Sequence, residues 1–309
     1  MNQIEQTTDF SGGSRDKTLA AMFLLGLALF LTLPAAKTAV YFFSAPYYLL
    51  PFGVLALISK IAEHLKKHSV SLTAWASAST FFCFGCFEVI YSWLPDTASW
   101  ITPDSPDAAF WRGMISYGGN RSLQIIPIAL LALIMAFKLK NLWRHRLKIG
   151  DISADTGILG EKQPMPWKRV CLRISFYFAL VTVGFLATKG FGSWNAGHAI
   201  LLSTRLTGGA ANSLVEELLF RGLLQPVFGI VVTPGVANIL QAVFFSVIHY
   251  GFIETLSFSE VFPELIKLIL YFGIGLFLGR AARETDGLLI PWFIHFIITS
   301  AIWLTLSQR

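Results

Sequence analysis

Residues 288–306 read LLIPWFIHFIITSAIWLTL, an apolar run in which His295 is the one ionisable side chain. A helix that crosses the ~30 Å hydrocarbon core of a bilayer needs about 17–25 residues of this kind. Comparable apolar blocks occur at 19–36, 47–62, 72–94, 122–137, 170–187, 199–224, 235–252 and 262–280. The sequence therefore predicts an all-α fold, a polytopic transmembrane helical bundle with about nine spans.

The composition excludes an ordinary soluble domain. The chain is 54% hydrophobic and 14% charged, with a mean hydropathy of +0.61, whereas soluble domains carry about 25% charged residues. The net charge of +6 lies in short loops between apolar blocks, and no basic segment is interleaved with aromatic residues in a way that suits nucleic-acid bases. We therefore expect the lipid bilayer as a partner and exclude nucleic acid.

The charged loops predict an orientation in the membrane. Lysine and arginine are concentrated in the loops 60–68, 138–173 and 280–284, while the loop 95–110 holds aspartates and no basic residue. Alternating spans place all the basic loops on the same side as the N-terminus. Because basic loops stay in the cytoplasm, we expect a cytoplasmic N-terminus.

Glycine and proline residues interrupt the helical periodicity over 144–168. This interruption predicts three parts: an N-terminal transmembrane bundle of about four helices over 1–143, a cytoplasmic linker over 144–168, and a core of about five helices over 169–309.

Five ionisable side chains lie well inside the apolar blocks of the C-terminal half: Glu216, Glu217, Arg221, His249 and His295. A charge at the centre of a membrane helix costs about 2.5–3.5 kcal/mol on insertion scales, so such residues indicate function. Buried polar residues also serve as contacts between helices, but this many in one half favours a site.

Helical spacing predicts how these side chains are grouped. Glu217 and Arg221 are four residues apart and are expected to form an ion pair, while Glu216 is rotated by about 100° and points elsewhere. Phe245 precedes His249 by four residues and Thr299 follows His295 by four, so each histidine has a companion on its own face. We expect Glu216, His249 and His295 in one layer near the middle of the membrane. That set suits activation of water and stabilisation of an oxyanion.

The order of these motifs resembles a known family. Glu-Glu-x-x-x-Arg at 216–221, Phe-x-x-x-His at 245–249 and the late His295 are similar to the CAAX protease and bacteriocin-processing family of glutamic-type intramembrane proteases, which includes the CAAX prenyl endopeptidases. The resemblance covers roughly residues 165–309 and makes 169–309 the protease core.

The resemblance implies a role for each matching residue. Glu216 would act with His249 to activate the attacking water, Glu217 and Arg221 would form a supporting ion pair, and His295 would hold the oxyanion. Thr299 stands where family members usually carry asparagine, and its hydroxyl donates over a shorter reach. The resemblance also implies a multi-pass protein of a bacterial inner membrane, a membrane-anchored peptide or protein as substrate, and no cofactor or metal.

Two other interpretations remain open from the residues. One is a metalloprotease with a glutamate and two histidines as ligands, although the zincin string His-Glu-x-x-His is missing and Arg221 disfavours a cation nearby. The other is a non-catalytic or proton-coupled membrane protein, a transporter or an immunity or accessory protein, that keeps the motif residues. An intramembrane endopeptidase is the leading expectation.

Overall fold

The computed structural model describes residues 14, 16–23, 46–93, 104–105, 108, 112, 126, 129–130, 148–157, 165–188, 196–249 and 258–306. Helices dominate these ranges. In chain order the elements are α3 (Pro46–His64), α4 (His68–Trp93), β1 (Asp155–Thr156), β2 (Met165–Pro166), α8 (Trp167–Thr188), α9 (Ala196–Glu217), the π-helix η3 (Leu218–Leu224), α10 (Gln225–Val231), α11 (Pro234–Ile248), α12 (Phe258–Thr285) and α13 (Leu289–Leu306).

The prediction of a helical protein is confirmed. The apolar blocks that overlap one helix each are 47–62, 72–94, 170–187, 235–252, 262–280 and 288–306. The blocks 19–36 and 122–137 lie largely outside the described residues. Among the described helices, only Val261–Thr285 is both long and apolar enough to cross a bilayer, while Pro234–Ser246 and Leu289–Ala301 are apolar but shorter. The nine spans and the cytoplasmic N-terminus stay predictions.

The block 199–224 differs from its predicted form. The sequence predicts one helix that ends at Leu224, but the last residues, Leu218–Leu224, are π-helical and the chain continues as α10 to Val231. Pro226 does not stop it, because a proline in the first turn of a helix loses no hydrogen bond. A π-helical turn inside a longer helix is frequent at functional sites.

The contacts between helices define two units, which are described separately. The first unit comprises the described parts of Met1–Glu88 and Leu223–Gly279, and the second comprises those of Val89–Gly222 and Arg280–Arg309. The proposed division at 144–168 stays a prediction. The described part of that segment is non-helical up to Pro166, as its glycines and prolines predict.

In the first unit, polar side chains tie neighbouring helices together. Ser59 on α3 donates to the carbonyl oxygen of Ser71 on α4 over 2.9 Å. Gln241 on α11 donates to the carbonyl oxygen of Gly275 on α12 over 2.8 Å. At Gly275 a Cβ atom would meet Ala242 at 3.0 Å, so the glycine permits this close approach of α11 and α12.

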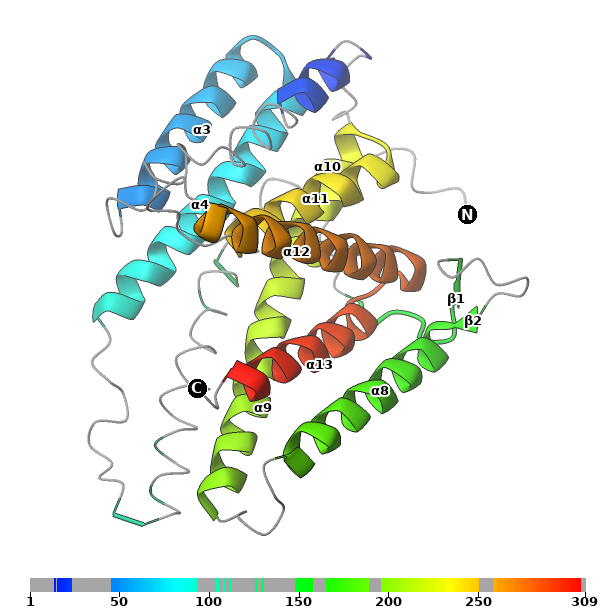
Figure 1. Ribbon diagram of the computed structural model, residues 1–309. Coiled ribbons are helices and arrows are strands. Elements are labelled where there is room, and N and C mark those ends of the chain that lie inside the picture. Colours follow the sequence, from blue (N-terminus) through cyan, green and yellow to red (C-terminus); the bar gives the residue numbers. More distant parts are fainter. Residues whose placement is uncertain are drawn as a thin grey trace. The chain divides into compact units, whose positions relative to one another are not determined.

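In the second unit, α13 packs against both α9 and α8, and the short antiparallel pair β1–β2 lies at the start of α8 (Figure 1). Trp167, the first residue of α8, is fully buried and donates from its indole nitrogen to Glu284 over 3.1 Å. Farther along α8, Leu172, Phe176 and Leu180 are exposed. A row of large exposed apolar side chains suits an apolar solvent such as lipid.

The segment 148–157 holds the start of α13. The amide of Leu288 donates to the carbonyl oxygen of Lys148 over 2.9 Å, and the amide of Leu289 donates to that of Ile149 over 3.1 Å. The first amides of a helix have no acceptor within the helix, so these bonds supply acceptors from another part of the chain. The segment therefore fixes where the helix that carries His295 begins.

Two glycines make this docking possible. Gly150 has a φ of +91°, in the left-handed region, and a Cβ atom there would lie 2.7 Å from Gly287 Cα and from the Thr285 carbonyl oxygen. A Cβ atom at Gly287 would lie 2.2 Å from Gly150 Cα. Both positions therefore require glycine, for the backbone angle at Gly150 and for the space at both.

We predict that Gly150→Ala destabilises the protein by about 1–3 kcal/mol, because alanine is strained at positive φ and its methyl group meets the α12–α13 turn. The thermal unfolding midpoint in detergent should fall. Gly184→Ala in α8 is the matched control, since a Cβ atom there meets nothing within 4 Å. An unchanged midpoint for Gly150→Ala would contradict the docked segment.

Candidate active site

Glu217 and Arg221 form a fully buried ion pair. Glu217 ends α9 and Arg221 lies in η3. Arg221 Nη1 donates to Glu217 Oε1 over 2.7 Å, and neither side chain is exposed to solvent. The predicted ion pair is confirmed. Each charge alone would cost several kcal/mol to bury, so each depends on the other.

His295 on α13 binds the same carboxylate. Its Nδ1 lies 2.7 Å from Glu217 Oε1, and only 5% of its side chain is exposed. Because a carboxylate accepts and does not donate, Nδ1 carries the hydrogen. In the neutral ring Nε2 is then an acceptor, and in the protonated ring Nε2–H is a second donor. Glu217 thus fixes which nitrogen faces the site.

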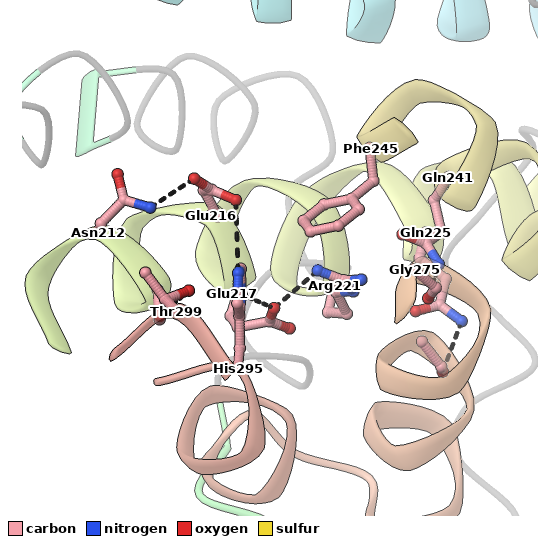
Figure 2. A network of polar contacts seen from close by, with 12 residues as sticks. Asn212, Glu216, Glu217, Arg221, Gln225, Gln241, Phe245, Gly275, His295 and Thr299 are labelled. Carbon is pink, nitrogen blue, oxygen red and sulfur yellow. Dashed lines mark hydrogen bonds and ion pairs between the residues drawn. The ribbon is translucent and has the colours of Figure 1, made fainter. Parts of the chain in front are cut away.

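Glu216 lies between Asn212 and His295, as Figure 2 shows. Asn212 Nδ2 donates to Glu216 Oε1 over 2.6 Å, and Glu216 Oε2 lies 3.7 Å from His295 Nε2. The sequence predicted Glu216 and His295 in one layer, and this contact between the two side chains agrees with that prediction. The two nitrogens of one imidazole lie on different edges of the ring, so a histidine from a second helix faces both glutamates. The 3.7 Å spacing exceeds a direct hydrogen bond and is one that a water molecule can bridge.

Small side chains bring α13 this close to α9. At Gly209 a Cβ atom would lie 2.8 Å from Ser300 Oγ, so a larger residue there would displace the Ser300 side chain. The indole nitrogen of Trp292 donates to the carbonyl oxygen of Ala210 over 3.0 Å. Small residues at helix contacts are typical of membrane bundles, where backbones approach closely.

Thr299 lies in the same layer of contacts between α9 and α13. Ser213 Oγ donates to Thr299 Oγ1 over 3.3 Å, and both residues are buried. The hydrogen of the Thr299 hydroxyl is not used in that bond. The prediction placed Thr299 beside His295 on one face, and Figure 2 shows the two residues near Glu217. Its role as an oxyanion donor stays a prediction.

His249 belongs to the first unit, just after α11. Its Nδ1 lies 2.7 Å from the carbonyl oxygen of Phe245, so Nδ1 donates and Nε2 is the acceptor of the neutral ring. The His249 ring stacks on Tyr271 of α12, with centroids 4.1 Å apart and an interplanar angle of 17°. Phe245 is thus the companion that its spacing predicted, although its backbone carbonyl makes the bond. The pairing of His249 with Glu216 stays a prediction.

Within the described ranges, no group of three or more histidine, cysteine, aspartate or glutamate side chains is arranged to hold a metal ion. The partners of Glu217 are the guanidinium of Arg221 and the imidazole of His295, not a set of metal ligands. This set can accept a proton at Glu216 and can present a second N–H at His295 when the ring is protonated. Metal-independent chemistry stays a prediction.

Several residues with contacts to the predicted site were not predicted. Asn212 precedes Glu216 by four residues, so the spacing rule that paired Glu217 with Arg221 would have found it. Ser213 contacts Thr299 on α13, and no local spacing indicates that contact. Tyr271 lies on another helix from His249, and no local spacing indicates that contact.

The comparisons with known proteins place this site in a family. Residues 198–301 match the model of the Rce1-like family, described as type II CAAX prenyl endopeptidase Rce1-like. The matched range contains all six predicted site residues, Glu216, Glu217, Arg221, His249, His295 and Thr299. No curated protein and no solved structure matches the chain. Residues 198–301 are therefore a domain of the Rce1-like type II CAAX prenyl endopeptidase family, a family of membrane-embedded proteases.

Proposed function

We propose that this protein is an intramembrane endopeptidase that hydrolyses membrane-presented peptides or protein C-terminal tails with a water molecule activated by Glu216 and His249. The observation that carries the proposal is the buried cluster in which Glu217 binds both Arg221 and His295, with Glu216 facing His295 at 3.7 Å. Burying such a set of charges in an apolar chain is costly, and its presence therefore indicates a function. The family domain over 198–301 supports the same conclusion.

In the proposed reaction the water oxygen attacks the carbonyl carbon of the peptide bond and one water proton passes to Glu216. His249 orients the water through Nε2, because Nδ1 is engaged with the Phe245 carbonyl. The proton on Glu216 then passes to the amine nitrogen as the carbon–nitrogen bond breaks. The products are an amine and a carboxylic acid, and no covalent enzyme intermediate forms.

His295 and Thr299 stabilise the oxyanion in this proposal. The bond from His295 Nδ1 to Glu217 turns Nε2 toward the site, and in the protonated ring Nε2–H can donate to the developing charge. Arg221 pairs with Glu217 and so helps to hold this carboxylate in place. Glu217 and Arg221 thus support the reaction without touching the substrate.

The proposed substrate class follows from the proposed position of the site inside the membrane. We propose a multi-pass protein of a bacterial inner membrane, with the catalytic groups in a layer inside the bilayer. Peptides that reach this layer are membrane-anchored, by a lipid group or by a transmembrane helix. The N-terminal helices over 1–143 are proposed as a separate bundle beside the protease core.

We predict that Glu216→Gln and His249→Ala each lower kcat at least about 100-fold, because the first removes the group that accepts the water proton and the second removes the group that orients the water. The assay uses proteoliposomes and two fluorogenic peptides, one ending in a farnesyl-cysteine followed by three residues and one containing a membrane-spanning helix with a C-terminal tail. A chelator should leave the wild-type rate unchanged.

Glu264→Gln is the matched control for Glu216→Gln, because Glu264 is a buried glutamate of α12 that pairs with Lys267. We expect it to retain activity. Cleavage by Glu216→Gln at the wild-type rate would contradict the proposal and favour a non-catalytic or proton-coupled role. Loss of wild-type activity on chelation would favour the metalloprotease.

We predict that Arg221→Leu destabilises the protein by about 3–5 kcal/mol, because it leaves the Glu217 carboxylate buried without its cation. The double variant Glu217→Gln/Arg221→Leu should regain much of that stability. Arg280→Leu is the control: Arg280 pairs with Glu284 at the same four-residue spacing, but 39% of its side chain is exposed, so the loss should be about 0–1 kcal/mol. Unfolding midpoints in detergent measure all three. Equal losses for the two arginine variants would contradict the buried charge.

A further inference from the structure

Asn212 makes the shortest hydrogen bond within the predicted site. Its Nδ2 donates to Glu216 Oε1 over 2.6 Å, from one turn earlier on α9. The Glu216 side chain is 15% exposed, so the bond is largely removed from solvent. Hydrogen bonds to an ionised group in such surroundings are short and about twice as strong as neutral ones.

The bond also sets the direction of the carboxylate. With Oε1 bound to Asn212, Oε2 is turned toward His295 Nε2 at 3.7 Å (Figure 2). A glutamate side chain has rotatable bonds, and a free one would sample several rotamers. One oxygen is therefore held on α9 while the other faces His295.

The hydrogen bond of the Asn212 amide differs from those of the other buried amide side chains that the structure describes. Gln225, Asn238 and Gln241 each donate to a main-chain carbonyl of α12, at Gly279, Leu276 and Gly275 respectively, and so tie helices together. Asn212 donates to a carboxylate of its own helix. Asparagine is also a poorer helix former than alanine. Neither packing between helices nor helix propensity therefore accounts for an asparagine at position 212.

We propose that Asn212 is a positioning residue for the peptidase reaction, holding Glu216 so that Oε2 is directed at the reacting water. The inference rests on the proposed function of Glu216. Because an N–H donor bonds more strongly to a carboxylate than to a carboxylic acid, removal of the Asn212 amide should alter proton uptake by Glu216.

Other charged groups near Glu216 act on its protonation as well. His295 faces it from α13, Glu217 is its chain neighbour, and Arg221 lies in η3. Because these groups remain in an Asn212 variant, the change measured in that variant reports the amide.

The first experiment needs no substrate. Infrared difference spectra recorded over a pH series identify the Glu216 carboxyl band by its loss in Glu216→Gln. In Asn212→Leu we expect the midpoint of protonation of that band to rise by about one pH unit, because one charge-assisted bond is lost. Asn212→Gln, which keeps an amide, should restore part of the shift.

Asn238→Leu is the matched control, since it removes a buried amide of the structural kind. It should lower the thermal unfolding midpoint and leave the Glu216 band where it is in wild type. An unchanged Glu216 midpoint in Asn212→Leu overturns the proposal, whatever happens to the stability of that variant.

The second experiment uses the farnesyl-cysteine and helix-tail peptides. We expect Asn212→Leu to lower kcat roughly tenfold with KM unchanged, and to move the acid limb of kcat/KM to higher pH. A shifted infrared midpoint with wild-type kinetics overturns the positioning role while Glu216 remains catalytic. Full activity in Glu216→Gln instead contradicts the proposed function itself and with it the inference, so the two failures are distinguishable.

Discussion

The buried carboxylate of Glu217 is the group on which the C-terminal site depends. It accepts one hydrogen bond from Arg221, in the same helical stretch, and one from His295, on α13. The first bond makes the negative charge tolerable at a position without solvent. The second bond holds His295 against the same carboxylate. Because His295 belongs to α13 and Glu217 to α9, this bond helps to fix the position of α13 against α9.

The other contacts between α9 and α13 are compatible with that position. A glycine at 209 leaves room for the Ser300 side chain, and the hydroxyl groups at 213 and 299 bond to each other across the two helices. In a protein surrounded by lipid, apolar side chains gain little by packing on one another instead of on lipid tails. Close packing and interhelical hydrogen bonds therefore specify the arrangement, and both are present here.

Much of this site could be predicted from the sequence, because its main contacts are local. The Glu217–Arg221 ion pair follows from helical spacing alone. The apolar blocks predicted the positions of most of the described helices. The contact of His295 with both glutamates could not be predicted, since it depends on how α13 crosses α9. The π-helical form of 218–224 and the stacking of His249 on Tyr271 are equally matters of tertiary contact. Spacing rules describe neighbours one turn apart, and these features join residues that no spacing rule relates.

The docking of residues 148–157 has a mechanical consequence. The amides of Leu288 and Leu289, at the start of α13, donate to carbonyl oxygens of Lys148 and Ile149, so the helix that bears His295 is anchored by a non-helical stretch distant in sequence. A peptide-bond break within that stretch would cut the tether of α13 without touching any charged residue of the site. The contacts of His295 with the two glutamates would then loosen, although the break lies at a distance from them.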